Sequence, residues 1–226
     1  MNIVYSKSIQ IATYYKEEAA IAELKSMGLN TDIFNDALAY GWNFRINSQE
    51  AFDVPLFGGT SQWAKSTSRL RFLLSSIGWQ SDDDKNLSKI VSPNKEIAII
   101  VSSGNAGTGK EGVPVTTKNP KGELLETIIN SNLEGIQKKL FPNVQEIIKK
   151  DFDIKAIWYL LYFNDENKNE IRSELSLPIQ IENNGKINKW AKRILLSPVN
   201  VDPTPLNNYK QEFNDDIQID ISRKAN

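Results

Sequence analysis

Two neighbouring segments with strand-like patterns constrain the fold of this chain more than any other feature. Residues 154–163 (IKAIWYLLYF) are apolar almost throughout, and residues 170–181 alternate between apolar and polar side chains. The six residues between them are all polar. Such alternation is typical of a strand with one buried face, and a short polar turn joins antiparallel neighbours. The sequence therefore predicts a β-hairpin, with an edge or a bulge at Pro178, because proline cannot donate a ladder hydrogen bond.

The alternation also assigns the side chains of the second strand to two faces. One face carries Ile171, Leu175, Leu177, Ile179 and Ile181, and the other carries Arg172, Glu174 and Ser176. We expect the first face to be buried in the core. We expect the second face to be solvated, with cross-strand ion pairs of the kind found on exposed sheet surfaces.

A third buried strand is predicted at residues 96–102, where the apolar run is nearly continuous. A long loop with several glycines follows and extends to residue 122. The stripe of apolar residues over 123–140 predicts a helix, and Pro142 can open a short further helix over 143–150. The loop is interpreted as a surface excursion between the strand and the first of these helices.

The N-terminal part of the chain has the periodicity of helices. Helices are predicted over residues 9–27, over 30–40 with Gly41 as the terminator, and over 62–77, while 42–59 is expected to be irregular. Residues 81–94 are interpreted as a surface loop, with a short strand near 87–91. The spacing over 186–196 predicts a helix, with a strand as the alternative, and 215–222 alternates as a last strand would.

Helices that precede strands in the sequence indicate an α+β fold. We expect one domain over residues 1–226, with a helical N-terminal part (9–78) and a sheet-containing part (94–222). The sheet is expected to be mostly antiparallel, with three to five strands packed by helices.

Composition excludes several kinds of chemistry. The chain of 226 residues contains no cysteine and no histidine, which rules out disulfides, thiol nucleophiles and histidine-based triads. Its net charge is −1, so no overall positive field attracts nucleic acid. No apolar run approaches the ~18 residues of a membrane span, and the N-terminus does not resemble a signal peptide. We expect a cytoplasmic protein without a membrane partner or a covalent cofactor.

The glycine-rich loop matches the spacing of a phosphate-binding G-x-x-x-x-G-K motif. Gly104, Gly107, Gly109 and Lys110 would form an anion site of backbone N–H groups and one cation. Glu111 stands where a serine or threonine would bind Mg²⁺, and prolines follow where a helix should begin. A loop without a ligand is therefore the preferred interpretation, and an anion or nucleotide site, helped by Lys118 and Lys121, is an alternative.

Carboxylates near the hairpin suggest a second alternative. Asp153, Glu170 and Glu174 could hold Mg²⁺ in a metal-dependent nuclease or hydrolase. Arg172 occupies the position where such nucleases carry a lysine, and arginine is a poor activator of water. A catalytic site or a metal site is therefore not the preferred interpretation, and Mg²⁺ is expected only under this alternative.

Basic residues near aromatic residues suggest contact with nucleic acid. The candidates are Arg45, Lys65, Arg69, Arg71, Lys189 and Arg193, which could bind phosphates while a neighbouring tryptophan stacks on a base. Because no catalytic constellation stands out, the preferred function is non-enzymatic. The sequence suggests an interaction or accessory protein of a bacterial or phage-related assembly, with protein or nucleic acid as its partner.

Overall fold

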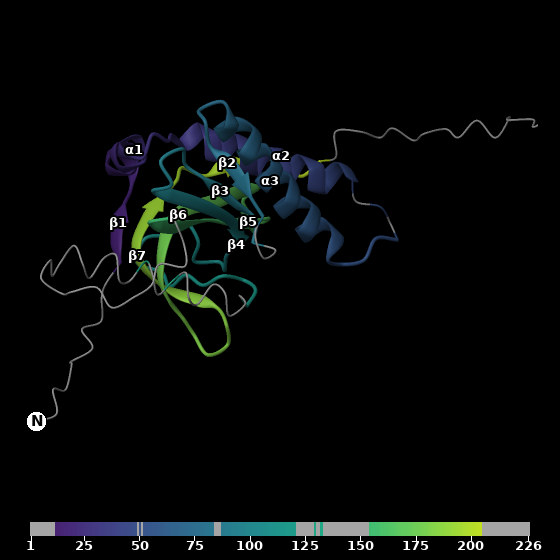
Figure 1. Ribbon diagram of the computed structural model, residues 1–226. Helices are drawn as coiled ribbons and strands as arrows, with labels where there is room; N and C mark the ends of the chain where they lie inside the picture. Colours follow the sequence, from purple (N-terminus) through teal and green to yellow (C-terminus); the bar gives the residue numbers. More distant parts are fainter. Residues whose placement is uncertain are drawn as a thin grey trace, which may run out of the picture.

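The predicted hairpin lies at the centre of a mixed sheet in the computed structural model (Figure 1). The structure describes residues 12–48, 50, 52–83, 87–120, 129, 132 and 154–204. Within them the strands are β1 (Thr13–Tyr15), β2 (Gln80–Asp82), β3 (Lys89–Val91), β4 (Ile97–Ser103), β5 (Ala156–Asp165), β6 (Glu170–Ile181), β7 (Ile187–Leu195) and β8 (Val199–Asn200).

The strand order is β1-β7-β6-β5-β4-β3-β2, and β8 pairs with β6. The pairs β1–β7 and β4–β5 are parallel, and all other pairs are antiparallel. The α+β class and the mostly antiparallel sheet are confirmed. The expected number of three to five strands is wrong, because the part of the chain that the structure describes holds eight. The additional short strands β1, β2 and β8 carry little sequence pattern of their own.

The β5–β6 hairpin has the register that a short turn imposes, with Phe163 opposite Arg172. The irregularity expected at Pro178 is confirmed, since the β6–β7 register shifts on both sides of this residue. The shift reverses the direction of later side chains. Ile181 therefore packs on the other side of the sheet from Leu175, and its predicted face is wrong.

Three helices of the described chain are α1 (Glu17–Ser26), α2 (Thr31–Ser48) and α3 (Phe57–Ser75). The predicted helix over 9–27 is correct only from Glu17, because residues 13–15 form β1. This short strand depends on tertiary pairing, with Thr13 opposite Lys192 of β7. Local periodicity does not contain that information.

Gly41 does not end α2, contrary to the prediction, and part of 42–59 is helical. A Cβ atom at Gly41 would lie 2.0 Å from Ser66 Oγ and 2.6 Å from the carbonyl oxygen of Gln62. The glycine therefore allows α2 and α3 to approach closely, and α2 continues past it to Ser48. The predicted third helix is also longer, since α3 begins at Phe57.

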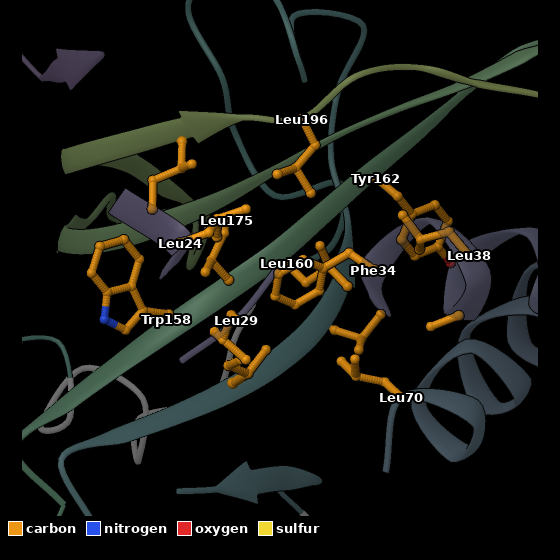
Figure 2. Close-up of a cluster of buried hydrophobic side chains, with 14 of the residues drawn as sticks. Leu24, Leu29, Phe34, Leu38, Leu70, Trp158, Leu160, Tyr162, Leu175 and Leu196 are labelled. Carbon is orange, nitrogen blue, oxygen red and sulfur yellow. The ribbon is translucent and has the colours of Figure 1, made fainter. Parts of the chain in front are cut away.

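The sheet is covered on both faces. On one face the helices and strands share a core that includes Leu24, Phe34, Leu38, Leu70, Trp158, Leu160 and Leu175 (Figure 2). On the other face a second cluster includes Ala98, Ile100, Val115, Ile129, Tyr159, Leu161 and Trp190. Val115 belongs to the glycine-rich loop, so this loop covers the second face and is not a simple surface excursion. Cover on both sides explains the continuous apolar runs of β4 and β5.

Residues 187–195 form a strand, so the predicted helix is wrong and the strand alternative is correct. Leu177 and Pro178 of β6 pair with Lys192 and Trp190, which leaves Ala191 between them as a bulge in β7. Ala191 packs in the helix-side core, whereas Trp190 packs in the opposite cluster. This irregular alternation imitates helical spacing in the sequence.

Ile129 and Asn132 are helical and buried, in agreement with the helix expected over 123–140. The side chain of Asn132 accepts a hydrogen bond from the N–H of Ile157 and donates to the carbonyl oxygens of Ile157 and Pro178. The rest of that helix, the helix over 143–150 and the strand over 215–222 lie outside the described residues. In the described part of the chain, no helix has the length and apolarity needed to cross a membrane.

Candidate functional site

The glycine-rich loop uses its backbone N–H groups inside the protein. Gly104 donates to the carbonyl oxygen of Tyr162, Gly107 donates to Asn105 Oδ1, and Gly109 donates to Glu174 Oε2 at 2.8 Å. The backbone N–H of Lys110 is also bound, to the carbonyl oxygen of Gly107. An anion bound at these four residues would have to displace these bonds, because two of the N–H groups bond to the sheet and two bond within the loop.

Glu174 and Arg193 form a buried ion pair beneath this loop. Arg193 Nε lies 2.9 Å from Glu174 Oε1, and Arg193 Nη2 lies 2.6 Å from Oε2. The guanidinium also donates to the carbonyl oxygens of Lys110 and Val113 and to the hydroxyl of Tyr14. Burial opposes the charged form of Arg193, but the hydrogen bonds and charge of Glu174 leave its pKa raised. The pair fastens the loop to β6 and β7.

The polar face of β6 is consequently buried, and its expected solvation is wrong. Arg172, Glu174 and Ser176 are 4%, 0% and 0% exposed. Arg172 donates to the carbonyl oxygen of Ala106 in the loop and packs over the ring of Phe163. Polar residues alternate here because they bind a polar backbone segment laid across the sheet.

The structure does not bring the described candidate catalytic carboxylates together. Glu170 and Glu174 stand four residues apart on β6, which is about 13 Å along a strand. Asp153 lies outside the described residues. Among the residues that are described, no group of three potential metal-binding side chains is present. Glu174 is moreover fully engaged by Arg193 and Gly109.

Lys65 and Arg69 share one face of the α2–α3 pair. Lys65 lies over the ring of Phe44, and Arg69 lies over the rings of Tyr40 and Phe72. Arg69 also forms two hydrogen bonds with Asp36, at 2.8 and 2.9 Å. These bonds lower the pKa of Asp36, so this carboxylate offsets the charge of Arg69 at neutral pH.

The other basic candidates are dispersed. Arg71 turns away from this face and binds Asp83 through both terminal nitrogens. Lys189 is exposed on β7, opposite Gln180. Arg193 is 2% exposed and is bound to Glu174. Of the six basic candidates, only Arg45 lines the cavity described next.

A groove of about 840 Å³ opens where β4 and β5 end. Its walls come from α2, the start of α3, the strands β4 and β5, residues 116–120 and the residue before β7. Its lining includes Arg45, Pro55, Leu56, Gln62, Trp63, Lys118, Tyr162, Asn164, Glu166 and Lys186. Cavities of ~300–1,000 Å³ with a few polar groups are the usual size of ligand sites.

Trp63 forms part of the apolar side of the groove. Its Nε1–H donates to the carbonyl oxygen of Val101 at 3.0 Å, which fixes the indole against β4. The bond is possible because β3 pairs only with Ala98 and Ile99, so Val101 lies beyond it. Trp63 is 39% exposed, and Leu56, which also lines the groove, is 78% exposed.

The groove carries more positive than negative charge. Among its described lining residues, Arg45, Lys118 and Lys186 are basic and Glu166 alone is acidic. Arg45 Nη2 lies 3.6 Å from Glu166 Oε1, and Arg45 Nη1 donates a hydrogen bond to Gln62 Oε1 at 3.3 Å. Lys118 is held in place by its backbone N–H, which donates to the carbonyl oxygen of Ser103. Lys118 and Lys186 are distant in sequence, and only the folded chain places both in the lining of one groove.

The groove contains a closed pair of amides. Gln62 Nε2 donates to Asn164 Oδ1 at 2.9 Å, and Asn164 Nδ2 donates to Gln62 Oε1 at 2.8 Å. Tyr162 lies nearby, and burial raises its pKa to about 12, against a smaller opposing effect of Arg45. This hydroxyl is therefore neutral at physiological pH, and Arg45, Lys118 and Lys186 supply the positive charge.

Comparison with known proteins adds no relative. No protein-family model matches the chain, and neither the curated proteins nor the solved structures contain a significant match. The groove therefore has to be interpreted from its own chemistry.

Proposed function

We propose that this chain is a non-enzymatic binding protein that contacts nucleic acid through the groove at the ends of β4 and β5. One observation carries the proposal: three basic side chains and an exposed tryptophan converge in one cavity of about 840 Å³. Phosphates account for a large share of nucleic-acid affinity, and lysine and arginine are their usual partners. An accessory role in a bacterial or phage-related assembly is consistent with such binding and stays a prediction.

The alternatives have less support in the geometry. A metal-dependent nuclease would need carboxylates that converge, whereas Glu170 and Glu174 are spaced along one strand and Glu174 is paired with Arg193. An anion site at residues 104–110 would need N–H groups that are already bonded. Binding in the groove requires neither convergent carboxylates nor the release of bonded N–H groups.

Binding can be measured by fluorescence anisotropy with labelled oligonucleotides, single-stranded and duplex, at several salt concentrations. We expect affinity to fall as salt rises, because bound phosphates release counterions. The double variant Lys118→Glu/Lys186→Glu should weaken binding by about tenfold or more at low salt, since it reverses two charges in the groove.

The matched control is the double variant Lys25→Glu/Lys168→Glu, which reverses two charges at exposed lysines outside the groove lining. It should leave the affinity nearly unchanged. Absence of binding to either polymer at low salt, or an equal loss in the control, would refute nucleic-acid binding through the groove.

A further inference from the structure

We infer that the groove accepts an unpaired strand, with a base stacked on Trp63 and the adjoining phosphates at Lys118 and Lys186. The inference rests on the proposed function and specifies its ligand class. It adds a requirement on the ligand, because stacking needs an accessible base face whereas phosphate contact needs only the backbone. Only a strand with accessible base faces can meet both demands in one cavity.

The indole of Trp63 is prepared for stacking. Its hydrogen bond to Val101 holds one edge of the ring against β4, while 39% of the residue remains exposed. Pro55 and Leu56 line the same groove and add to its apolar surface. A ring already fixed in place loses little conformational freedom when a base stacks on it.

The two lysines provide the complementary charge. Lys118 belongs to the last part of the glycine-rich loop, and Lys186 directly precedes β7. Neither forms an ion pair with any residue that the structure describes. Both charges are therefore available to phosphates, unlike Arg69 and Arg71, which are bound to carboxylates.

A duplex fits this arrangement poorly. Its bases are stacked and paired inside the helix, so their faces cannot reach Trp63 unless the duplex opens. Single strands, in contrast, commonly combine a positively charged groove with aromatic stacking. The cavity has the size of a site for one small ligand, which suits a few nucleotides of one strand.

The amides of the groove indicate little sequence preference. Free asparagine or glutamine amides can read adenine through two hydrogen bonds. Here Gln62 and Asn164 bind each other through both of their polar atoms. Recognition by stacking and charge alone tolerates any base, because every base has a flat face.

The experiment compares the full chain with single-stranded oligonucleotides of mixed sequence and with the matched duplex. Single strands should bind about tenfold or more tightly than the duplex. Trp63→Leu should weaken single-strand binding by about tenfold, since stacking on an aromatic ring contributes that much or more. Trp63→Phe keeps a ring and should retain most of the affinity. Phe72→Leu, at an exposed aromatic residue of α3 outside the groove, is the control.

Tryptophan fluorescence provides a second measurement. Single strands should quench the emission of the wild-type chain, and Trp63→Phe should remove most of this quenching although four other tryptophans remain. Thermal unfolding of each variant separates a loss of binding from a loss of folding.

The outcomes distinguish this inference from the proposed function. If duplex binds as tightly as single strands, or Trp63→Leu binds normally, the stacking arrangement is refuted while salt-dependent binding through Lys118 and Lys186 still stands. If neither polymer binds at low salt, both are refuted.

Discussion

At the scale of single residues, the buried pair of Glu174 and Arg193 has the largest expected energetic effect. Each carboxylate oxygen of Glu174 accepts a hydrogen bond from Arg193, and Gly109 and Ser176 donate two more. A buried ion pair adds little net stability when it is complete, but removal of one partner leaves an uncompensated charge.

We therefore expect Glu174→Gln to lower the free energy of unfolding by about 3–5 kcal/mol, because Arg193 would remain charged and buried. Urea unfolding measures this change. Asp36→Asn is the matched control, since it removes a carboxylate from a two-bond arginine pair at an exposed site. Its cost should be about 1 kcal/mol or less. Equal costs for the two variants would contradict the buried role of Glu174.

At the scale of secondary-structure elements, α2 and α3 depend on close approach at Gly41. Gly41→Ala would improve the helix propensity of α2 by about 1 kcal/mol. The added Cβ would, however, meet the backbone of Gln62 at 2.6 Å, and such overpacking costs about 1–3 kcal/mol. We expect a net loss of stability, measured as a lower midpoint of thermal unfolding.

Gly59→Ala is the control for this prediction. Gly59 lies in the first turn of α3, and a Cβ there would meet no atom within 4 Å. Its unfolding midpoint should stay unchanged or rise slightly. If Gly41→Ala behaves in the same way, the packing of α2 against α3 differs from the structure.

The elements also show what the sequence can predict. The long strands β4, β5 and β6 are predicted because their apolar residues form continuous or alternating runs. β1 and β2 are not, since three residues form a strand only when a partner strand is present. The burial of Arg172 and Glu174 could not be predicted for a related reason. Solvent and a polar loop backbone both favour polar side chains, so alternation alone cannot distinguish them.

The same limit applies to the candidate site. Arg45, Gly104 and Lys118 are predicted site residues that line the groove, but the sequence assigned them to two different sites and did not place Arg45 near Lys118 or Lys186. Those lysines belong to two separate basic segments, and their common location requires β4, β5 and β7 to be assembled. The hydrogen bond of Trp63 to the carbonyl oxygen of Val101 also depends on the assembled sheet, which no residue of α3 reveals.

At the scale of the whole molecule, the glycine-rich loop acts as a covering layer of the sheet. Thr108 and Thr117 in this loop are fully buried. Its backbone is bonded to Tyr162, Glu174 and Ile187. We expect the amide hydrogen of Gly109 to exchange with solvent about as slowly as those of the strands, because its opening requires release of the loop from Glu174.

Native-state hydrogen exchange measured by NMR tests this expectation. Gly185, which lies in the exposed turn between β6 and β7, is the internal comparison, since its N–H bonds only to the nearby carbonyl of Glu182. Rapid exchange of Gly109, at the rate of Gly185, would show that the loop does not cover the sheet in solution.

The contacts of β7 have a consequence for how the chain is made. Arg193 bonds with Tyr14 across 179 positions, and Lys192 bonds with Glu23 across 169. β1 and α1 are therefore synthesised more than 160 residues before their partner strand β7. Until then the apolar faces of α1 and β4 have no complete cover, which favours slow folding and contact with chaperones during synthesis.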